Sequence, residues 1–301
     1  MRVIDAIEGS GTGPLLILIG GLHGNEKEGI LAIKRVFAVL RENNCAVNGK
    51  IIGLRGNLKA LQVNQRFISY DLNRCWTKKH ANYLRQSKHN WALPEDEEAR
   101  ALLDIIDEYA GNDQYSEKIL ADLHTTSSDS GAFLIIPEYF ARSGVVKALN
   151  VPVITNAEHY LKGTLMVHAC DQDFISFSFE GGQMYTHSAV EVHETGIWTM
   201  MKALNMMDDF PGYAEDLLNF RHYQSSPAPE YFKMIHLHRV HQNDNFRMNP
   251  GYRNLSVVKR GEEIAYDYRG AIRSPEEGYI FMPLYQDTGE DGFFLVVKES
   301  G

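Results

Sequence analysis

Strand and helix signals alternate through the first two thirds of the sequence, and no other feature constrains the fold as strongly. Residues 15–20, LLILIG, form a short, continuously apolar segment that ends in glycine, which is typical of a fully buried strand. Residues from about Glu26 to Arg41 then place apolar side chains near the helical period. Further strands are expected at 50–57, 117–126, 132–137 and 174–182, and further helices at 94–112 and 187–207. This alternation predicts an α/β fold with a largely parallel sheet.

The sequence changes character near residues 225–230, SSPAPE. Beyond this point the expected strands are short. Turn-forming segments such as Asn-Pro-Gly and Lys-Arg-Gly separate them, which indicates β-structure with tight turns. We therefore predict two domains, a large α/β domain at 1–224 and a smaller all-β domain at 225–301.

Composition and charge argue against several classes of protein. The 301 residues carry a formal net charge of -9, whereas a general nucleic-acid binder normally presents a basic surface. Cys45, Cys75 and Cys170 are too few and too scattered for a disulfide framework or a cysteine-based zinc site. No apolar run approaches the roughly 18 residues of a membrane span, and the first residues contain acids where a signal peptide needs apolar side chains. We therefore expect a cytoplasmic, soluble protein that binds neither nucleic acid nor membrane.

Polar residues that could take part in catalysis or ligand binding follow several of the expected strands. They are His23 and Glu26 after the first strand, Asn73 and Arg74 on the long connection after the second, His124 at the end of the third, and Glu180 at the end of the fifth. Ligands of open α/β sheets gather at the carboxyl ends of the strands, so these side chains are expected at one edge of the sheet. Singly, each has an ordinary structural explanation, such as a turn cap at His23 or a helix-dipole contact at Glu26. Their joint placement favours a functional site.

Two histidines and a glutamate suit a catalytic zinc ion, which takes three protein ligands and leaves a fourth position for water. His23 and Glu26 are three residues apart at a turn that enters a helix, so they can point to one side together. His124 would complete the set from a distant strand end.

A second histidine cluster competes with this set. His236, His238 and His241 lie close together in the sequence, followed by Asp244. On a strand the first two face one way and the third faces the other, so the three cannot converge on a metal ion without a bend. We therefore favour the first set.

Four motifs, in this order and at these spacings, resemble the aspartoacylase and succinylglutamate desuccinylase family. They are GGLHGNEKEG from residue 20, RFISYDLNR from residue 66, DLHTT from residue 122 and FEGG from residue 179. The resemblance covers about residues 14–207 and is looser beyond them. It implies a zinc-dependent amidohydrolase with a zinc-carboxypeptidase-like fold, in which a mixed, largely parallel sheet is flanked by helices. The domain at 1–224 would then be the catalytic domain.

The same resemblance implies a metal site and a proton-transfer residue. It places one zinc ion per chain on His23, Glu26 and His124, and it makes Glu180 the general base and acid. These roles suit the residue types, because zinc lowers the pKa of a bound water molecule and a carboxylate can accept the proton released. Asp122 shares a strand face with His124 and could orient that ligand, although a buried structural acid is an equal alternative.

The resemblance further implies a set of residues that bind the substrate. Arg66 would polarise the scissile carbonyl and stabilise the oxyanion, while Asn73 and Arg74 would bind the substrate carboxylate. One feature departs from the family, because residues 161–180 contain no arginine where aspartoacylases carry an additional substrate-binding arginine. This departure argues against N-acetylaspartate as the substrate. Tyr279 and Tyr285 are both candidates for the tyrosine that the C-terminal domain contributes in aspartoacylases.

The C-terminal segment is also similar to small barrel-sandwich domains of the biotinyl or lipoyl type. The modified lysine of those domains lies at a hairpin tip, where this chain has Pro275, Glu276 and Glu277. We therefore expect no carrier role and interpret the domain as a wall of the active site.

The main hypothesis is a zinc-dependent hydrolase that removes an acyl group from a small N-acyl amino acid. A zinc carboxypeptidase that acts on a short peptide or a peptide-like conjugate is the alternative enzyme, since the same zinc ligands would serve it. A binding module without activity is a third hypothesis, but such a module would need neither Glu180 nor Arg66. The sequence leaves open the acyl group, the amino acid and whether the chain forms a homo-oligomer.

Overall fold

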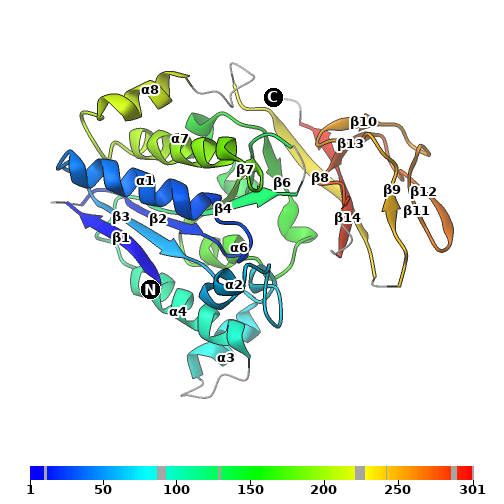
Figure 1. The fold of residues 1–301 in the computed structure, drawn as a ribbon, viewed down its shortest axis with the longest axis horizontal. Coiled ribbons are helices and arrows are strands. Elements are labelled where there is room, and N and C mark those ends of the chain that lie inside the picture. Colours follow the sequence, from blue (N-terminus) through cyan, green and yellow to red (C-terminus); the bar gives the residue numbers. More distant parts are fainter. Residues whose placement is uncertain are drawn as a thin grey trace.

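The apolar strand segments lie side by side in one large sheet (Figure 1). The computed structural model describes residues 1–9, 12–86, 93–127, 130–220, 228–241, 243–285 and 290–299. Within these residues the sheet has eleven strands. From one edge to the other they are β1 (Val3–Glu8), β3 (Lys50–Arg55), β2 (Leu15–Gly20), β4 (Lys118–Thr126), β7 (Ile175–Gln183), β5 (Phe133–Ile135), β6 (Val153–Thr155), β8 (Tyr231–Arg239), β14 (Asp291–Lys298), β13 (Gly278–Phe281) and β10 (Ser256–Val258).

The centre of the sheet is parallel, as the alternation of strands and helices predicts. Strands β3, β2, β4 and β7 run in one direction, whereas β1 is antiparallel to β3 and β5 is antiparallel to β7. Every side chain of β2 is buried, because Leu16 and Leu18 pack into the core on one face and Leu15, Ile17 and Ile19 pack into the core on the other. A strand buried on both faces explains why this segment is continuously apolar.

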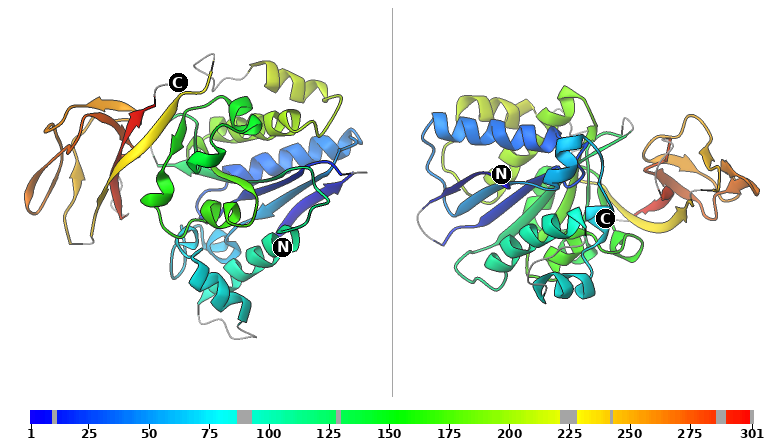
Figure 2. Two further views of the ribbon diagram at one scale, coloured as in Figure 1. Left: turned by 180° about the vertical axis from the view of Figure 1, so that it is seen from behind. Right: turned by 60° about the horizontal axis from the view of Figure 1, so that its bottom comes forward.

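Helices cover both faces of the parallel region (Figures 1 and 2). On one face lie α1 (Glu28–Glu42), α5 (Gly144–Leu149), α7 (His187–Ala203) and α8 (Gly212–Phe220). On the other lie α3 (Lys78–Gln86), α4 (Pro94–Tyr109) and α6 (Leu165–Cys170), and α2 (Leu58–Val63) contacts α4. Among the described helices, none has both the length and the apolar character that a membrane crossing requires.

The C-terminal region is antiparallel β-structure that continues the large sheet. Strand β8 pairs in parallel with β6, and β14, β13 and β10 follow it in antiparallel order. A small second sheet contains β12 (Gly270–Arg273), β11 (Glu263–Asp267) and β9 (Arg247–Met248). In Figure 1 this region projects from the side of the α/β body. The predicted boundary between residues 224 and 225 lies outside the described residues, so the two-domain division stays a prediction.

The local elements differ from the sequence prediction in a few places. The first helix begins at Glu28 instead of Glu26, which leaves Glu26 on the turn. Strands β1 and β6 were not predicted from the sequence. β1 is a half-exposed edge strand and β6 has three residues, so neither produces a clear apolar pattern.

Candidate metal centre

Two backbone features bring the motif residues to one edge of the sheet. Strands β2, β4 and β7 are parallel, so their carboxyl ends meet there, and His124 of β4 pairs directly with Glu180 of β7. The chain leaves β2 through Gly21, whose φ of 74° favours glycine. Helix α1 then approaches so closely that a Cβ on Gly29 would lie 2.7 Å from the Cβ of Leu123. Only a glycine allows the helix to start directly against the end of β4.

His23, Glu26 and His124 form a buried group whose ligand atoms all lie within 4.8 Å of one another. Glu26 is at its centre, with Oε1 2.8 Å from Nδ1 of His23 and Oε2 3.0 Å from Nδ1 of His124. In the part of the chain that the structure describes, this is the one group of three such residues arranged to hold a metal ion. The three residues that the sequence suggests as zinc ligands therefore do lie together.

Carboxylates hold the outer ring nitrogen of each histidine. Nε2 of His23 lies 3.1 Å from Oδ1 of Asp71, and Nε2 of His124 lies 2.7 Å from Oδ2 of Asp122. Metal-binding histidines are usually held in this way, because a carboxylate on one nitrogen fixes the ring and directs the other nitrogen to the metal. Here Nδ1 of both rings faces Glu26.

The chemistry of this donor set fits a zinc ion. Two imidazole nitrogens and one carboxylate are the ligands of many catalytic zinc sites. Burial opposes ionisation of Glu26, but His23 and His124 outweigh it and hold the pKa of that carboxyl well below its usual value. Burial likewise opposes a charge on His124, yet Asp122 and Glu26 raise its pKa well above the usual value. A cation at this position would therefore compete with a proton on His124.

Glu180 lies beside this group with its side chain buried. Burial raises its pKa to about 8; His124 opposes the shift, and the carboxylates of Glu26 and Asp122 add to it. Its Oε2 atom has no hydrogen-bond partner among the described residues. A buried carboxyl with a raised pKa beside a metal-binding group is a common arrangement for a residue that transfers protons.

Arg66 connects the metal-binding group to Asp71. Its Nη2 and Nε atoms lie 2.9 and 3.2 Å from Oδ2 of Asp71, and its Nη1 lies 3.6 Å from Oε1 of Glu26. The guanidinium is partly exposed, so it faces both the metal-binding group and solvent. This position is compatible with the predicted contact to a substrate carbonyl.

Asn73 and Arg74 lie next to the metal-binding group on a 3-10 helix, Leu72–Arg74, which the side chain of Asp71 caps. The buried side chain of Asn73 accepts a hydrogen bond from the backbone of Leu165, and its Nδ2 lies 3.4 Å from Nε2 of His124. Arg74 instead extends toward the C-terminal region, where its Nη2 lies 3.1 Å from Oδ2 of Asp291. Both side chains therefore already have protein partners.

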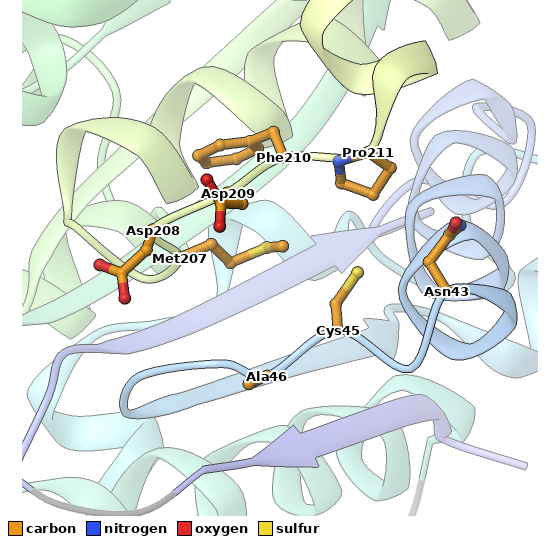
Figure 3. A pocket seen from close by; sticks show the side chains of 8 residues that line it. All are labelled: Asn43, Cys45, Ala46, Met207, Asp208, Asp209, Phe210 and Pro211. Carbon is orange, nitrogen blue, oxygen red and sulfur yellow. The ribbon is translucent and has the colours of Figure 1, made fainter.

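Two features lie outside this site. His236 and His238 are on β8, where the ring of His238 stacks on Phe293, so these histidines pack against aromatic side chains. A pocket of about 410 Å³ lies at the C-terminal end of α1. Figure 3 shows the side chains that line it. It is lined by Asn43, Cys45, Ala46, Met207, Asp208, Asp209, Phe210 and Pro211. Since the metal-binding group is at the other end of α1, we do not assign this pocket to the same site.

The sequence did not reveal two contributors to the site. Asp71 lies within the motif RFISYDLNR, but no local pattern indicates that it would contact His23, 48 residues away. Asp291 is separated from Arg74 by 217 residues and lies outside every motif.

Comparisons with known proteins identify sequence relatives of the chain. The model of the succinylglutamate desuccinylase/aspartoacylase catalytic domain matches residues 12–196. A probable aspartoacylase from Acaryochloris marina is 33% identical over 124 residues, which are 40% of this chain and 38% of that protein. A probable aspartoacylase from Prochlorococcus marinus is 29% identical over 286 residues, covering 90% of this chain and 87% of that protein.

Solved structures show the same fold. A succinylglutamate desuccinylase/aspartoacylase from Rhodobacter sphaeroides superposes with a TM-score of 0.68 at 16% identity, covering 98% of this chain and 88% of that one. A succinylglutamate desuccinylase from Vibrio parahaemolyticus gives a TM-score of 0.67 at 13% identity, covering 98% and 91%. At these identities the likeness establishes the fold alone.

Proposed function

Because the chain belongs to the succinylglutamate desuccinylase/aspartoacylase family, we propose that it is a zinc-dependent hydrolase that removes the acyl group from an N-acyl amino acid. The observation that carries the proposal is the pairing of each histidine with an outer carboxylate, which aims both Nδ1 atoms at Glu26. A group that only stabilised the fold would not need this arrangement beside a buried glutamate. His23, Glu26 and His124 would hold the zinc ion. When bound, zinc supplies a Lewis acid and lowers the pKa of a water molecule toward neutrality.

Glu180 moves the proton in this proposal. Its carboxylate accepts a proton from the attacking water and returns it to the nitrogen of the departing amino acid. The free Oε2 atom supports this role, because none of the described residues competes for it. A pKa raised by burial also supports it, since a base and acid used in one cycle works best near the operating pH.

Arg66 stabilises negative charge in the same cycle. Its guanidinium lies between Asp71 and Glu26 and keeps an exposed face, so it can donate to the oxygen of the scissile amide as negative charge develops there. Asn73 and Arg74 would position the substrate through its carboxylate. Asn73 can reach it through Nδ2, because its Oδ1 accepts from Leu165.

Release of free amine from a panel of compounds tests the proposal. The zinc-loaded protein is incubated with N-acetyl and N-succinyl amino acids and, for the carboxypeptidase alternative, with short peptides. We expect hydrolysis of N-acyl amino acids and its loss in Glu180→Gln. Glu117→Gln is the matched control, because Glu117 is a half-buried glutamate at the opposite end of β4. Cleavage of the peptides alone would contradict the proposal and favour the alternative.

A further inference from the structure

Three charged side chains from different segments meet beside the metal centre. Asp291, at the start of β14, pairs through Oδ2 with Arg74 and through Oδ1 with Arg239, at the end of β8. Arg239 also donates to the backbone oxygen of Tyr160 at 2.9 Å, and Arg74 donates to the backbone oxygen of Asn73 at 2.9 Å. We call Arg74, Asp291 and Arg239 the arginine–aspartate cluster. Each guanidinium is thereby fixed in place by a carboxylate and by the backbone.

Arg74 places one end of the cluster next to the metal centre. Arg74 follows Asn73, whose amide lies 3.4 Å from His124. Both residues lie on the 3-10 helix that Asp71 caps, and Asp71 contacts His23. The side chains of Arg74, Asp291 and Arg239 are 31%, 20% and 41% exposed, so an incoming carboxylate can reach them.

The net charge of the cluster limits what it can bind. Two arginines and one aspartate give a net charge of +1, which one substrate carboxylate neutralises. A second carboxylate, as in an N-acylated aspartate or glutamate, would meet a neutral cluster and the negative charge of Asp291. Like charges at short distance disfavour binding unless they are fully solvated.

We propose that Asp291 is a specificity-determining residue: by pairing with Arg74 and Arg239, it restricts the enzyme to N-acyl amino acids with a single carboxylate. This inference rests on the proposed function and names the substrate class of the same site. The absence of arginine from residues 161–180 points the same way, because that segment offers no other guanidinium for a second carboxylate.

A pair of matched substrates tests the inference. N-acetylasparagine and N-acetylaspartate have nearly the same shape and differ by one negative charge. We expect the wild-type enzyme to have the higher kcat/KM for N-acetylasparagine. Asp291→Asn should shift the ratio of the two kcat/KM values toward N-acetylaspartate by roughly two- to fivefold, the scale of one partly exposed ion pair. The shift should come mainly through KM, because the zinc ligands and Glu180 are unchanged.

Companion variants separate charge from structure. Asp291→Glu keeps the charge and should keep the wild-type ratio. Asp291→Asn combined with Arg239→Gln returns the cluster to a net charge of +1 and should restore that ratio. Asp107→Asn breaks a similar pair with Arg85, between α3 and α4, and should leave the ratio unchanged.

The outcomes distinguish this inference from the proposed function. If the wild-type enzyme hydrolyses neither compound nor any other N-acyl amino acid, the proposed function fails, and the specificity assignment with it. If the enzyme is active but prefers N-acetylaspartate, or if Asp291→Asn leaves the ratio unchanged, only the role of Asp291 is wrong. A ratio that shifts in the double variant as far as in Asp291→Asn would also overturn the charge argument.

Discussion

The metal centre and the arginine–aspartate cluster are neighbours with opposite character. The metal centre is buried, and each histidine is held on both ring nitrogens by carboxylates. The cluster is partly exposed and joins the α/β body to β8 and β14. Asn73 and Arg74, adjacent in the sequence, connect the two, because Asn73 faces His124 and Arg74 faces Asp291.

This difference suggests how such a fold separates chemistry from recognition. Buried donors with several partners each cannot be changed singly without leaving an unsatisfied charge, so the reaction is fixed. Exposed ion pairs contribute little to stability and can be replaced at small cost. Substrate preference can therefore change at the cluster while the metal centre stays the same.

The largest effect is expected at Glu180. Glu180→Gln should keep the fold and the zinc while losing roughly two to four orders of magnitude in kcat, the usual scale for a general base. In contrast, Asp291→Asn should change kcat for N-acetylasparagine very little. Steady-state kinetics of both variants check the contrast. Near-normal turnover by Glu180→Gln would assign the proton transfer to another residue.

Asp122 should have the next largest effect. Asp122→Asn removes the negative charge behind His124, so zinc affinity should fall by roughly 10- to 100-fold, as is usual when a partner of a metal-binding histidine is changed. Competition with a coloured chelator measures the affinity. Asp291→Asn provides the comparison and should bind zinc like the wild type. Equal affinity in all three proteins would exclude Asp122 as an orienting residue.

The pH dependence of kcat/KM should also report on the buried centre. Glu180 must be ionised to accept a proton, so activity should rise with pH through its pKa. Burial raises that pKa to about 8 from the ordinary 4.5, and a cation beside it would lower it again. We therefore expect kcat/KM to decline on the acid side with a midpoint between pH 4.5 and about 8. Below that midpoint kcat/KM should fall about tenfold per pH unit.

A control separates this decline from loss of metal. Zinc content measured at each pH shows whether the ion has been released, since protonation of His124 would also reduce activity. The assignment to Glu180 is wrong if the residual activity of Glu180→Gln shows the same decline with zinc retained.

The smallest effect is expected on stability at the cluster. Asp291→Asn should lower the free energy of unfolding by less than about 1 kcal/mol, because the ion pairs that it weakens are partly exposed. Urea unfolding measures the change, with Asp107→Asn as a matched pair elsewhere. A loss of several kcal/mol would show that Asp291 mainly holds the C-terminal strands in place.

The two regions also differ in how far the sequence predicts them. His23 follows the continuously apolar strand β2, and His124 lies near the end of the buried strand β4. Parallel strands place their carboxyl ends together, so local pattern and one rule of sheet topology suffice. No comparable rule brings Arg74 to Asp291, because Asp291 lies on β14, whose pairing with β8 the sequence does not specify. The contact of Asp71 with His23 is hidden for the same reason, since it depends on the path of a long loop.

The central claim is that one zinc ion, held by His23, Glu26 and His124, is needed for amide hydrolysis. Its most direct test is to remove metal with a chelator, add zinc stepwise and follow both bound zinc and amine release from N-acetylasparagine. We expect activity to rise in proportion to zinc and to level off near one equivalent per chain. His124→Ala should neither bind the ion nor recover, whereas His187→Ala, at an exposed histidine of α7, should behave like the wild type. Full activity in the metal-free protein, or equal zinc in His124→Ala and the wild type, would contradict the claim.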